Sequence, residues 1–236
     1  ESFRVEFWRK HLDNVEEKLQ KLGTIVPKCI NNMVNAGLVP YAPVYANVPS
    51  DTISGGRSMA KYMKDLYKMP DKVQEVQDII HRENMETFRK QIRAFKPFAV
   101  FVGAARGASE FYSPKLWHRY IGPYIKQIVE MVVEEGAVAH LHFDSNWERD
   151  LDFFRSFPKG KCVFGTDHST NIYKLKEKLG DIMCIKGDVP PALLMLGTED
   201  EVYNYSTKLI KEIGPSGFIL APACTLPQNA KVENIK

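Results

Sequence analysis

The chain has 236 residues, of which 44% are hydrophobic and 26% charged, a composition typical of a globular protein with a full core. With 32 basic and 29 acidic residues the formal net charge is only +3, which gives no support to a nucleic-acid-binding or membrane-surface protein. No apolar run approaches the roughly 20 residues that span a bilayer. We therefore expect neither nucleic acid nor membrane among the partners.

The four cysteines are widely spaced, and none belongs to a Cys-x-x-Cys pair. In a chain of this length that pattern argues against a disulfide scaffold and for a reducing compartment. The first residues are polar and charged and do not have the pattern of a secretory leader. From these features we expect a cytoplasmic protein.

Short apolar segments alternate with longer amphipathic ones along the chain. The short segments are apolar on both faces, which is typical of parallel strands covered by helices. The expected strands are 41–45, 98–102, 137–143, 162–165, 183–186 and 218–221. The expected helices are 3–22, 72–95, 114–135 and one that opens at the capping box of Thr198 and Glu201 and runs to 212.

This alternation predicts an α/β protein, and no repeat or linker divides it, so we expect one domain over residues 1–236. Six strands are two fewer than the eight of a (β/α)8 TIM barrel, which typically has about 250 residues. Since the sequence opens at Glu1 and closes in a helix-like phrase, we expect the C-terminal two-thirds of such a barrel, with the N-terminal part missing. An open doubly wound sheet is the alternative, but no Gly-x-Gly-x-x-Gly follows a strand.

Polar residues at the carboxyl ends of the strands are the first place to look for an active site in a barrel. His140, His142 and Asp144 alternate through the third strand and therefore share its inward face. His142 and Asp144 could place a nitrogen and an oxygen on one metal ion, or they could form a hydrogen-bonded pair without one. Cys224 follows the last strand and is either a thiolate ligand or a small buried thiol.

Other strand ends carry weaker signals. Asp167 and His168 follow the fourth strand and Asp188 the fifth, where they either face substrate or cap the next helix. Asp51 and Arg57 lie in a segment that we interpret as a loop able to hold a polar or anionic group. Asp51, Asp167 and His168 are candidate catalytic residues, and the candidate substrate-binding residues are Arg57, His140, Asn146 and Asp188.

Several phrases, taken together and in this order, resemble the uroporphyrinogen decarboxylase superfamily over most of the chain. They are Pro49-Ser-Asp-Thr-Ile-Ser-Gly-Gly-Arg57, Phe111-Tyr-Ser-Pro114, Lys174-Leu-Lys-Glu-Lys-Leu-Gly180, Ile185-Lys-Gly-Asp-Val-Pro190, Leu196-Gly-Thr-Glu-Asp-Glu-Val202 and Gly217-Phe-Ile-Leu-Ala-Pro-Ala-Cys224 with Glu233-Asn234. The resemblance implies the TIM-barrel fold and one of two chemistries.

The zinc-dependent, corrinoid-linked methyltransferase branch is the better match. Its members bind zinc through a His-x-Cys pair and a later cysteine, and His142, Asp144 and Cys224 fall at those places. Asp144 is a departure, because an oxygen ligand is harder than a thiolate and suits a zinc ion that acts as a Lewis acid on an ether or hydroxyl oxygen. The resemblance therefore implies methyl transfer between a small substrate, such as an O-methyl compound, and the corrinoid (cobalamin) of a separate corrinoid protein.

Two alternatives remain. A decarboxylase acting on a tetrapyrrole would need no metal, but the Gly-His-Gly phrase of that branch is replaced by Pro222-Ala-Cys224. A non-catalytic barrel that binds a small molecule would need none of these residues. The methyltransferase hypothesis predicts stoichiometric zinc held by His142, Asp144 and Cys224.

Overall fold

The computed structural model describes the backbone of residues 3–236 and the side chains of residues 11, 12 and 14–236. Contacts divide the chain into two compact units, Glu1–Tyr41 and Ala42–Lys236. The first contains α1 (Phe3–Asn35), which is longer than the expected helix 3–22. The helix continues through Pro27 because a single proline removes only one hydrogen-bond donor from a long helix. All six strands lie in the second unit, and our expectation of a single domain stays a prediction.

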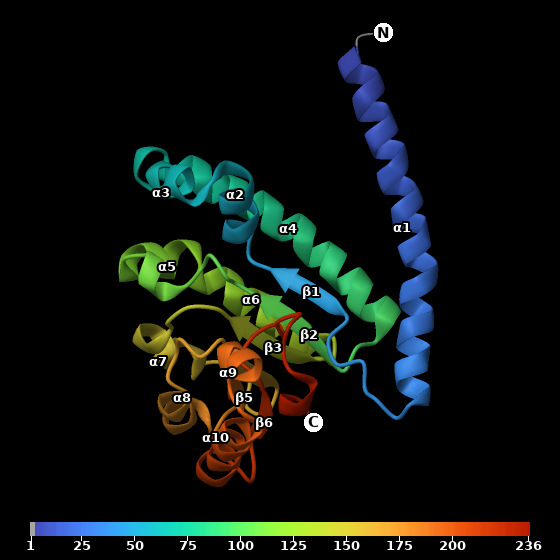
Figure 1. Cartoon of the computed structure of the whole chain (residues 1–236). Coiled ribbons are helices and arrows are strands. Elements are labelled where there is room, and N and C mark those ends of the chain that lie inside the picture. Colours follow the sequence, from blue (N-terminus) through green and yellow to red (C-terminus); the bar gives the residue numbers. More distant parts are fainter. Residues whose placement is uncertain (1–2) are drawn as a thin grey trace. The chain divides into compact units, whose positions relative to one another are not determined.

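The second unit is built on one parallel sheet. Its strands are β1 (Val44–Asn47), β2 (Ala99–Gly103), β3 (Val138–Phe143), β4 (Cys162–Thr166), β5 (Cys184–Val189) and β6 (Phe218–Pro222). They pair in sequence order from β1 to β6, always in parallel (Figure 1). A doubly wound sheet would reverse its order at a switch point, whereas a barrel adds strands in one direction. The chain therefore has an α/β fold with six parallel strands, as in part of a TIM barrel.

Helices connect the strands and cover the outer face of the sheet (Figure 1). Three of the expected helical segments, 72–95, 114–135 and the one from Thr198 to 212, overlap helices of this unit. The capping box of Thr198 and Glu201 is formed as predicted. The full set in this unit is α2 (Pro49–Arg57), α3 (Met59–Lys68), α4 (Pro70–Phe95), α5 (Pro114–Tyr120), α6 (Gly122–Glu134), α7 (Leu151–Phe154), α8 (Ile172–Leu179), α9 (Pro191–Leu196) and α10 (Glu199–Glu212), with short 3-10 turns at Ser109–Phe111, Glu148–Asp150 and Val232–Asn234. Among the helices of residues 3–236, none combines the length and apolar character needed to cross a bilayer.

Two predictions about local structure were wrong. The segment with Asp51 and Arg57, interpreted as a loop, forms α2, with Pro49 in its first turn, where a missing N–H costs nothing. The helix expected over 114–135 is divided at Ile121 into α5 and α6. Pro123 explains this break, because it lacks an amide proton and its ring disfavours a helical conformation before it.

An aromatic cluster holds the carboxyl end of β3 against the helices. Phe143 stacks on Trp147 with ring centroids 4.5 Å apart, and Phe154 and Phe164 meet Phe143 at 5.6 and 5.5 Å. All four side chains are fully buried. The indole N–H of Trp147 also donates a hydrogen bond of 2.7 Å to the carbonyl of Asp144. The cluster therefore fixes the backbone from which His142 and Asp144 project to the opposite face of the strand.

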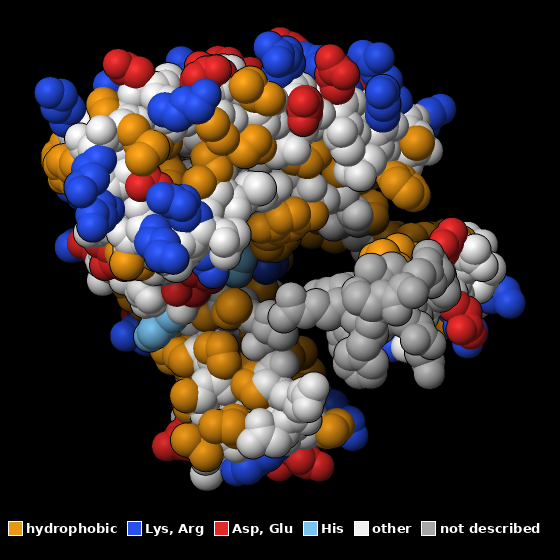
Figure 2. Space-filling model, turned by 90° about the horizontal axis from the view of Figure 1, so that it is seen from above, with side chains coloured by type: hydrophobic (Ala, Val, Ile, Leu, Met, Phe, Trp, Pro, Cys, Tyr) orange, Lys and Arg blue, Asp and Glu red, His pale blue; other side chains and the backbone are white. Residues whose placement is uncertain are grey.

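On the face seen in Figure 2, basic and acidic side chains are interspersed with hydrophobic ones. This mixture agrees with the near balance of 32 basic and 29 acidic residues in the sequence.

We expect Phe164→Ala to lower the free energy of unfolding by about 3–5 kcal/mol, because it leaves a cavity inside the aromatic cluster. Urea denaturation followed by circular dichroism measures the change. Phe95→Ala is the matched control, since Phe95 is 62% exposed. Equal effects of the two substitutions would show that the cluster does not support the sheet.

Candidate metal centre

A cavity of about 400 Å³ opens at the carboxyl ends of the strands. Strand alternation explains its lining, since Leu141 and Phe143 pack into the core while His140 and His142 face the cavity. The lining residues are Tyr45, Phe101, Gly103, Ala105, His140, His142, Asp144, Lys186, Pro222, Cys224 and Thr225. The inward direction predicted for His140, His142 and Asp144 is confirmed.

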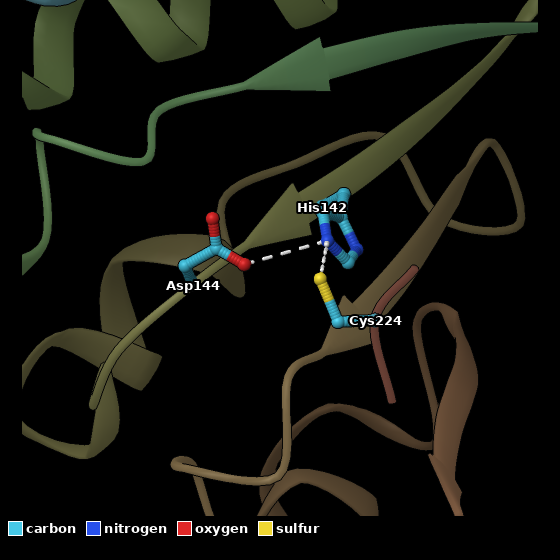
Figure 3. Close-up of side chains that lie close together, drawn as sticks. All are labelled: His142, Asp144 and Cys224. Carbon is cyan, nitrogen blue, oxygen red and sulfur yellow. Dashed lines mark hydrogen bonds and ion pairs between the residues drawn. The ribbon is translucent and has the colours of Figure 1, made fainter. Parts of the chain in front are cut away.

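Three side chains with different donor atoms converge in this cavity. Nε2 of His142 lies 3.5 Å from Oδ1 of Asp144 and 3.9 Å from Sγ of Cys224. One potential ligand atom from each residue lies within 4.8 Å of the others. Figure 3 shows the three side chains pointing toward one another, two from β3 and the loop after it and one from the segment after β6. Residues 82 positions apart in the chain thus form a group that could hold a metal ion.

Glycines on both sides of β3 make room for these side chains. His142 pairs with Gly103 of β2 and with Gly165 of β4. A Cβ atom at Gly165 would lie 3.0 Å from Nε2 of His140 and 3.4 Å from Nδ1 of His142. A Cβ at Gly103 would collide with the Tyr45 hydroxyl. Gly165 therefore leaves room for the two imidazoles, His140 above all, and Gly103 leaves room for the ring of Tyr45.

The electrostatics of the cavity favour an ionised Asp144 and a neutral His140. The hydrogen bond with His142 lowers the pKa of Asp144, and this effect outweighs the partial burial of the carboxyl group. Burial lowers the pKa of His140 to about 3, with contributions from the charges of Lys186 and His142. His140 therefore remains neutral at physiological pH and contributes no charge to the cavity.

Lys186 is a cavity residue in the strand-end segment Lys186-Gly-Asp188, of which only Asp188 was named as a candidate site residue. It lies on β5 in register with Gly165, and burial lowers its pKa while the Cys224 thiolate opposes that shift. The signal was present in the sequence, because a lysine at the end of an otherwise apolar strand segment is unusual.

The predicted site residues Asp167 and His168 follow β4, whereas Asp188, expected after the fifth strand, lies within β5 because that strand continues to Val189; all three make their contacts outside the cavity. Asp167 accepts backbone hydrogen bonds from Ser145 at 2.8 Å and Ser169 at 2.9 Å, so its carboxylate joins two loops. Nδ1 of His168 lies 2.9 Å from Oδ2 of the buried Asp188, whose Oδ1 accepts a hydrogen bond from the hydroxyl of a tyrosine on α10. None of these described residues is among those that line the cavity.

The side chain of Asn146 is also hydrogen-bonded to neighbouring loops. Its side-chain amide donates to the carbonyl of Ser169 at 3.2 Å, and its side-chain oxygen accepts from the amide of Glu148 at 2.9 Å. These bonds shape the loop after β3. A role in substrate binding for Asn146 stays a prediction.

Arg57 and Asp51 lie beside a second cavity. Arg57 forms an ion pair with Asp65 and lines a hollow of about 650 Å³, and Ala105 lines both this hollow and the first cavity. Asp51 accepts a hydrogen bond of 3.1 Å from the backbone amide of Arg106, and burial raises the pKa of its carboxyl group to about 6. Asp51 also raises the pKa of Tyr45 in the first cavity, after burial as the larger cause. Asp51 is therefore near the metal group, whereas Arg57 is committed to Asp65.

Comparison with known proteins agrees with this architecture. The family model for uroporphyrinogen decarboxylase (URO-D) matches residues 46–236, which is most of the chain. The chain belongs to the uroporphyrinogen decarboxylase family.

Two relatives illustrate its range. Over 110 residues the chain is 30% identical to uroporphyrinogen decarboxylase 1, chloroplastic, from Oryza sativa subsp. japonica, a match that covers 45% of this chain and 26% of that protein. A solved structure, a methyltransferase from Methanosarcina mazei, superposes with a TM-score of 0.67 at 17% identity, over 86% of this chain and 59% of that one. The second match shows a shared fold. The chain spans about a quarter of the curated relative it matches.

We expect Gly165→Ala to weaken binding of a divalent metal by at least about tenfold, because the added Cβ would lie 3.0 Å from Nε2 of His140 and would force this neighbour of His142 to shift. Titration with Co²⁺, followed by its visible absorption, measures the affinity. Gly56→Ala is the control, since a Cβ there meets no atom within 4 Å. Unchanged Co²⁺ affinity in the Gly165 variant would contradict the steric role of this glycine.

We expect Asp51→Asn to stabilise the protein at pH 8. The raised pKa of about 6 means that ionising Asp51 is less favourable in the folded than in the unfolded chain, so its charge destabilises the fold above pH 6. The difference in unfolding free energy between wild type and variant should shrink as the pH falls through 6. It should vanish below about 4, where Asp51 is protonated in both the folded and the unfolded chain. Urea midpoints at pH 8 and pH 4 test this, and a variant less stable than wild type at pH 8 would contradict it.

Proposed function

We propose that this protein is a corrinoid-dependent methyltransferase in which zinc, held by His142, Asp144 and Cys224, activates a small O-methyl substrate. The observation that carries the proposal is the convergence of one nitrogen, one oxygen and one sulfur donor within 4.8 Å in a cavity large enough for a small molecule. Membership of a family that includes enzymes supports a catalytic role for this cavity.

The donor set fits zinc better than a harder cation. Thiolate and imidazole are typical zinc ligands, whereas magnesium and calcium take oxygen ligands almost exclusively. Three protein ligands, rather than four, leave a position open for substrate, which is the pattern of catalytic zinc sites. Asp144 makes the set harder than one with two thiolates, which favours a substrate that binds through oxygen.

When bound here, zinc would supply Lewis-acid polarisation of the substrate oxygen, so that the methyl group leaves more readily. The chain's own residues hold the substrate against that position. Tyr45 and Phe101 stack at 5.3 Å and form one wall of the cavity. His140 stays neutral beside His142 and supports its orientation. When a corrinoid protein binds at the open mouth of the cavity, its corrinoid would supply the methyl acceptor or donor.

Among the other candidates, Asp51 is best placed to orient the substrate, because its charge acts on Tyr45 in the cavity wall. Asp167 and His168 engage Ser145, Ser169 and Asp188, so we assign them to the support of the loops around the mouth.

We also propose that the six strands form part of a closed eight-stranded barrel in a cytoplasmic protein. The in-order parallel pairing and the superposition on a longer structure, of which this chain covers 59%, support the barrel, and the four widely spaced cysteines support the cytoplasmic location.

Tetrapyrrole decarboxylation is the second candidate, favoured by the 30% identity to a curated uroporphyrinogen decarboxylase over 110 residues. That reaction would proceed without metal. Activity that survives removal of zinc by a chelator would therefore favour this candidate over methyl transfer.

We expect the protein to contain about one zinc ion per chain, and His142→Ala and Cys224→Ser each to lose it while remaining folded, since two of three ligands bind zinc far more weakly. Metal analysis by mass spectrometry measures the content. The controls are His118→Ala, on a surface helix, and Cys29→Ser, another exposed cysteine. Zinc retained in both site variants would rule out this ligand assignment.

The activity itself is tested with free cob(I)alamin and O-methyl compounds. Methyl transfer converts cob(I)alamin to methylcob(III)alamin, which absorption spectra distinguish. We expect wild type and both control variants to carry out this conversion and both ligand variants to be at least about a hundredfold slower, as for loss of a metal's Lewis acidity. Equal rates with and without zinc would reject the proposed function.

A further inference from the structure

The cavity that holds the candidate metal ligands also contains a lysine that the proposed function does not use. Lys186 of β5 and His142 of β3 both pair with Gly165, which lies between them on β4. Adjacent strands are about 4.8 Å apart, so the Cα atoms of Lys186 and His142 are roughly 10 Å apart across a position without a side chain. Both side chains therefore face one gap, and both line the same cavity.

Among the side chains that the structure describes, none gives the ammonium group of Lys186 a fixed anionic partner. In the part of the chain whose side chains the structure describes, Lys186 forms no ion pair, and Cys224 is the one group whose charge stabilises its protonated form. A cation that is partly removed from water is unfavourable unless an anion meets it. Cys224, however, is one of the proposed metal ligands.

Under the proposed function, the charges in the zinc-bound cavity do not balance. A divalent ion is balanced by the Asp144 carboxylate and the Cys224 thiolate, while a histidine ligand is neutral. Among the charged side chains that line the cavity, Lys186 then leaves one net positive charge, which a single anionic group on the occupant would balance.

We propose that Lys186 binds the anionic group of the substrate, so that the cavity selects small organic carboxylates over neutral molecules of the same shape. The stacked rings of Tyr45 and Phe101, with an angle of 26° between their planes, provide a flat apolar wall for the carbon skeleton. Lys186 is thus a specificity-determining residue that holds one end of the substrate while the open metal position faces the other.

The experiment compares benzoate with benzamide, which has nearly the same shape but no charge, by isothermal titration calorimetry on the zinc-loaded protein. We expect wild type to prefer benzoate by at least about tenfold, the range for a charge-assisted hydrogen bond. Lys186→Met should lose this preference and keep both its zinc and its affinity for benzamide. Lys115→Met, which removes an exposed lysine and changes the net charge equally, should behave as wild type.

Lys186→Gln repeats the test with a polar side chain if the methionine variant does not fold. A benzoate preference that persists in these variants would overturn the proposal, and so would a preference that falls only when zinc is lost, because the metal would then be the anion's partner. Absence of zinc from wild type would defeat the proposed function, and the ratio of benzoate to benzamide affinity, measured on the same protein, would still decide the role of Lys186.

Discussion

The site depends on one steric constraint, the absence of side chains on the strands that flank β3. Gly103 and Gly165 pair with His142 on either side. Adjacent parallel strands are only about 4.8 Å apart, so inward side chains crowd one another. The space above Gly103 and Gly165 is open to the rings of Tyr45, His140 and His142. The aromatic cluster of Phe143 and Trp147 on the opposite face then keeps β3 from turning or sliding. One strand thus carries core packing on one face and the chemistry on the other.

The chemical character of the site follows from its mixture of donors. Histidine and cysteine alone would describe a thiolate-rich zinc site suited to a thiol substrate. Asp144 brings an oxygen in place of a second sulfur, and its lowered pKa keeps it ionised and available as a ligand. Lys186 lines the same cavity and adds a positive charge that the proposed metal ligands do not neutralise once they bind a divalent ion. Under the proposed function, the two features together favour a substrate that approaches zinc through oxygen and carries an anionic group elsewhere.

Much of the fold could be predicted from the sequence because each strand is a short apolar run with a clear boundary. All six predicted strands overlap observed ones, and the parallel arrangement follows from their apolar character on both faces. The helix α2 was missed because Ser54-Gly-Gly-Arg57 has the composition of a loop, and local propensity is weaker than the packing of Ser54 into the buried interior. The break at Ile121 was missed although Pro123 marks it.

The candidate site was likewise predicted only in part from the sequence. His142 and Asp144 share a face by strand alternation, and the family resemblance joined them to Cys224, a pairing that spacing alone does not give. The contacts of Asp167, His168 and Arg57 could not be predicted, because their partners lie on other elements: Ser145, Asp188 and Asp65. Lys186 was not named as a candidate site residue because its significance depends on Gly165, a neighbour that only the register of β4 and β5 identifies.

The central claim is that one zinc ion is bound by a nitrogen, an oxygen and a sulfur from His142, Asp144 and Cys224. X-ray absorption spectroscopy at the zinc edge of the zinc-loaded protein tests it most directly. The account predicts a single sulfur ligand at about 2.3 Å together with nitrogen or oxygen ligands at about 2.0–2.2 Å, and a spectrum without sulfur in Cys224→Ser. A zinc shell with no sulfur in the wild type, or one with two or more, would contradict it.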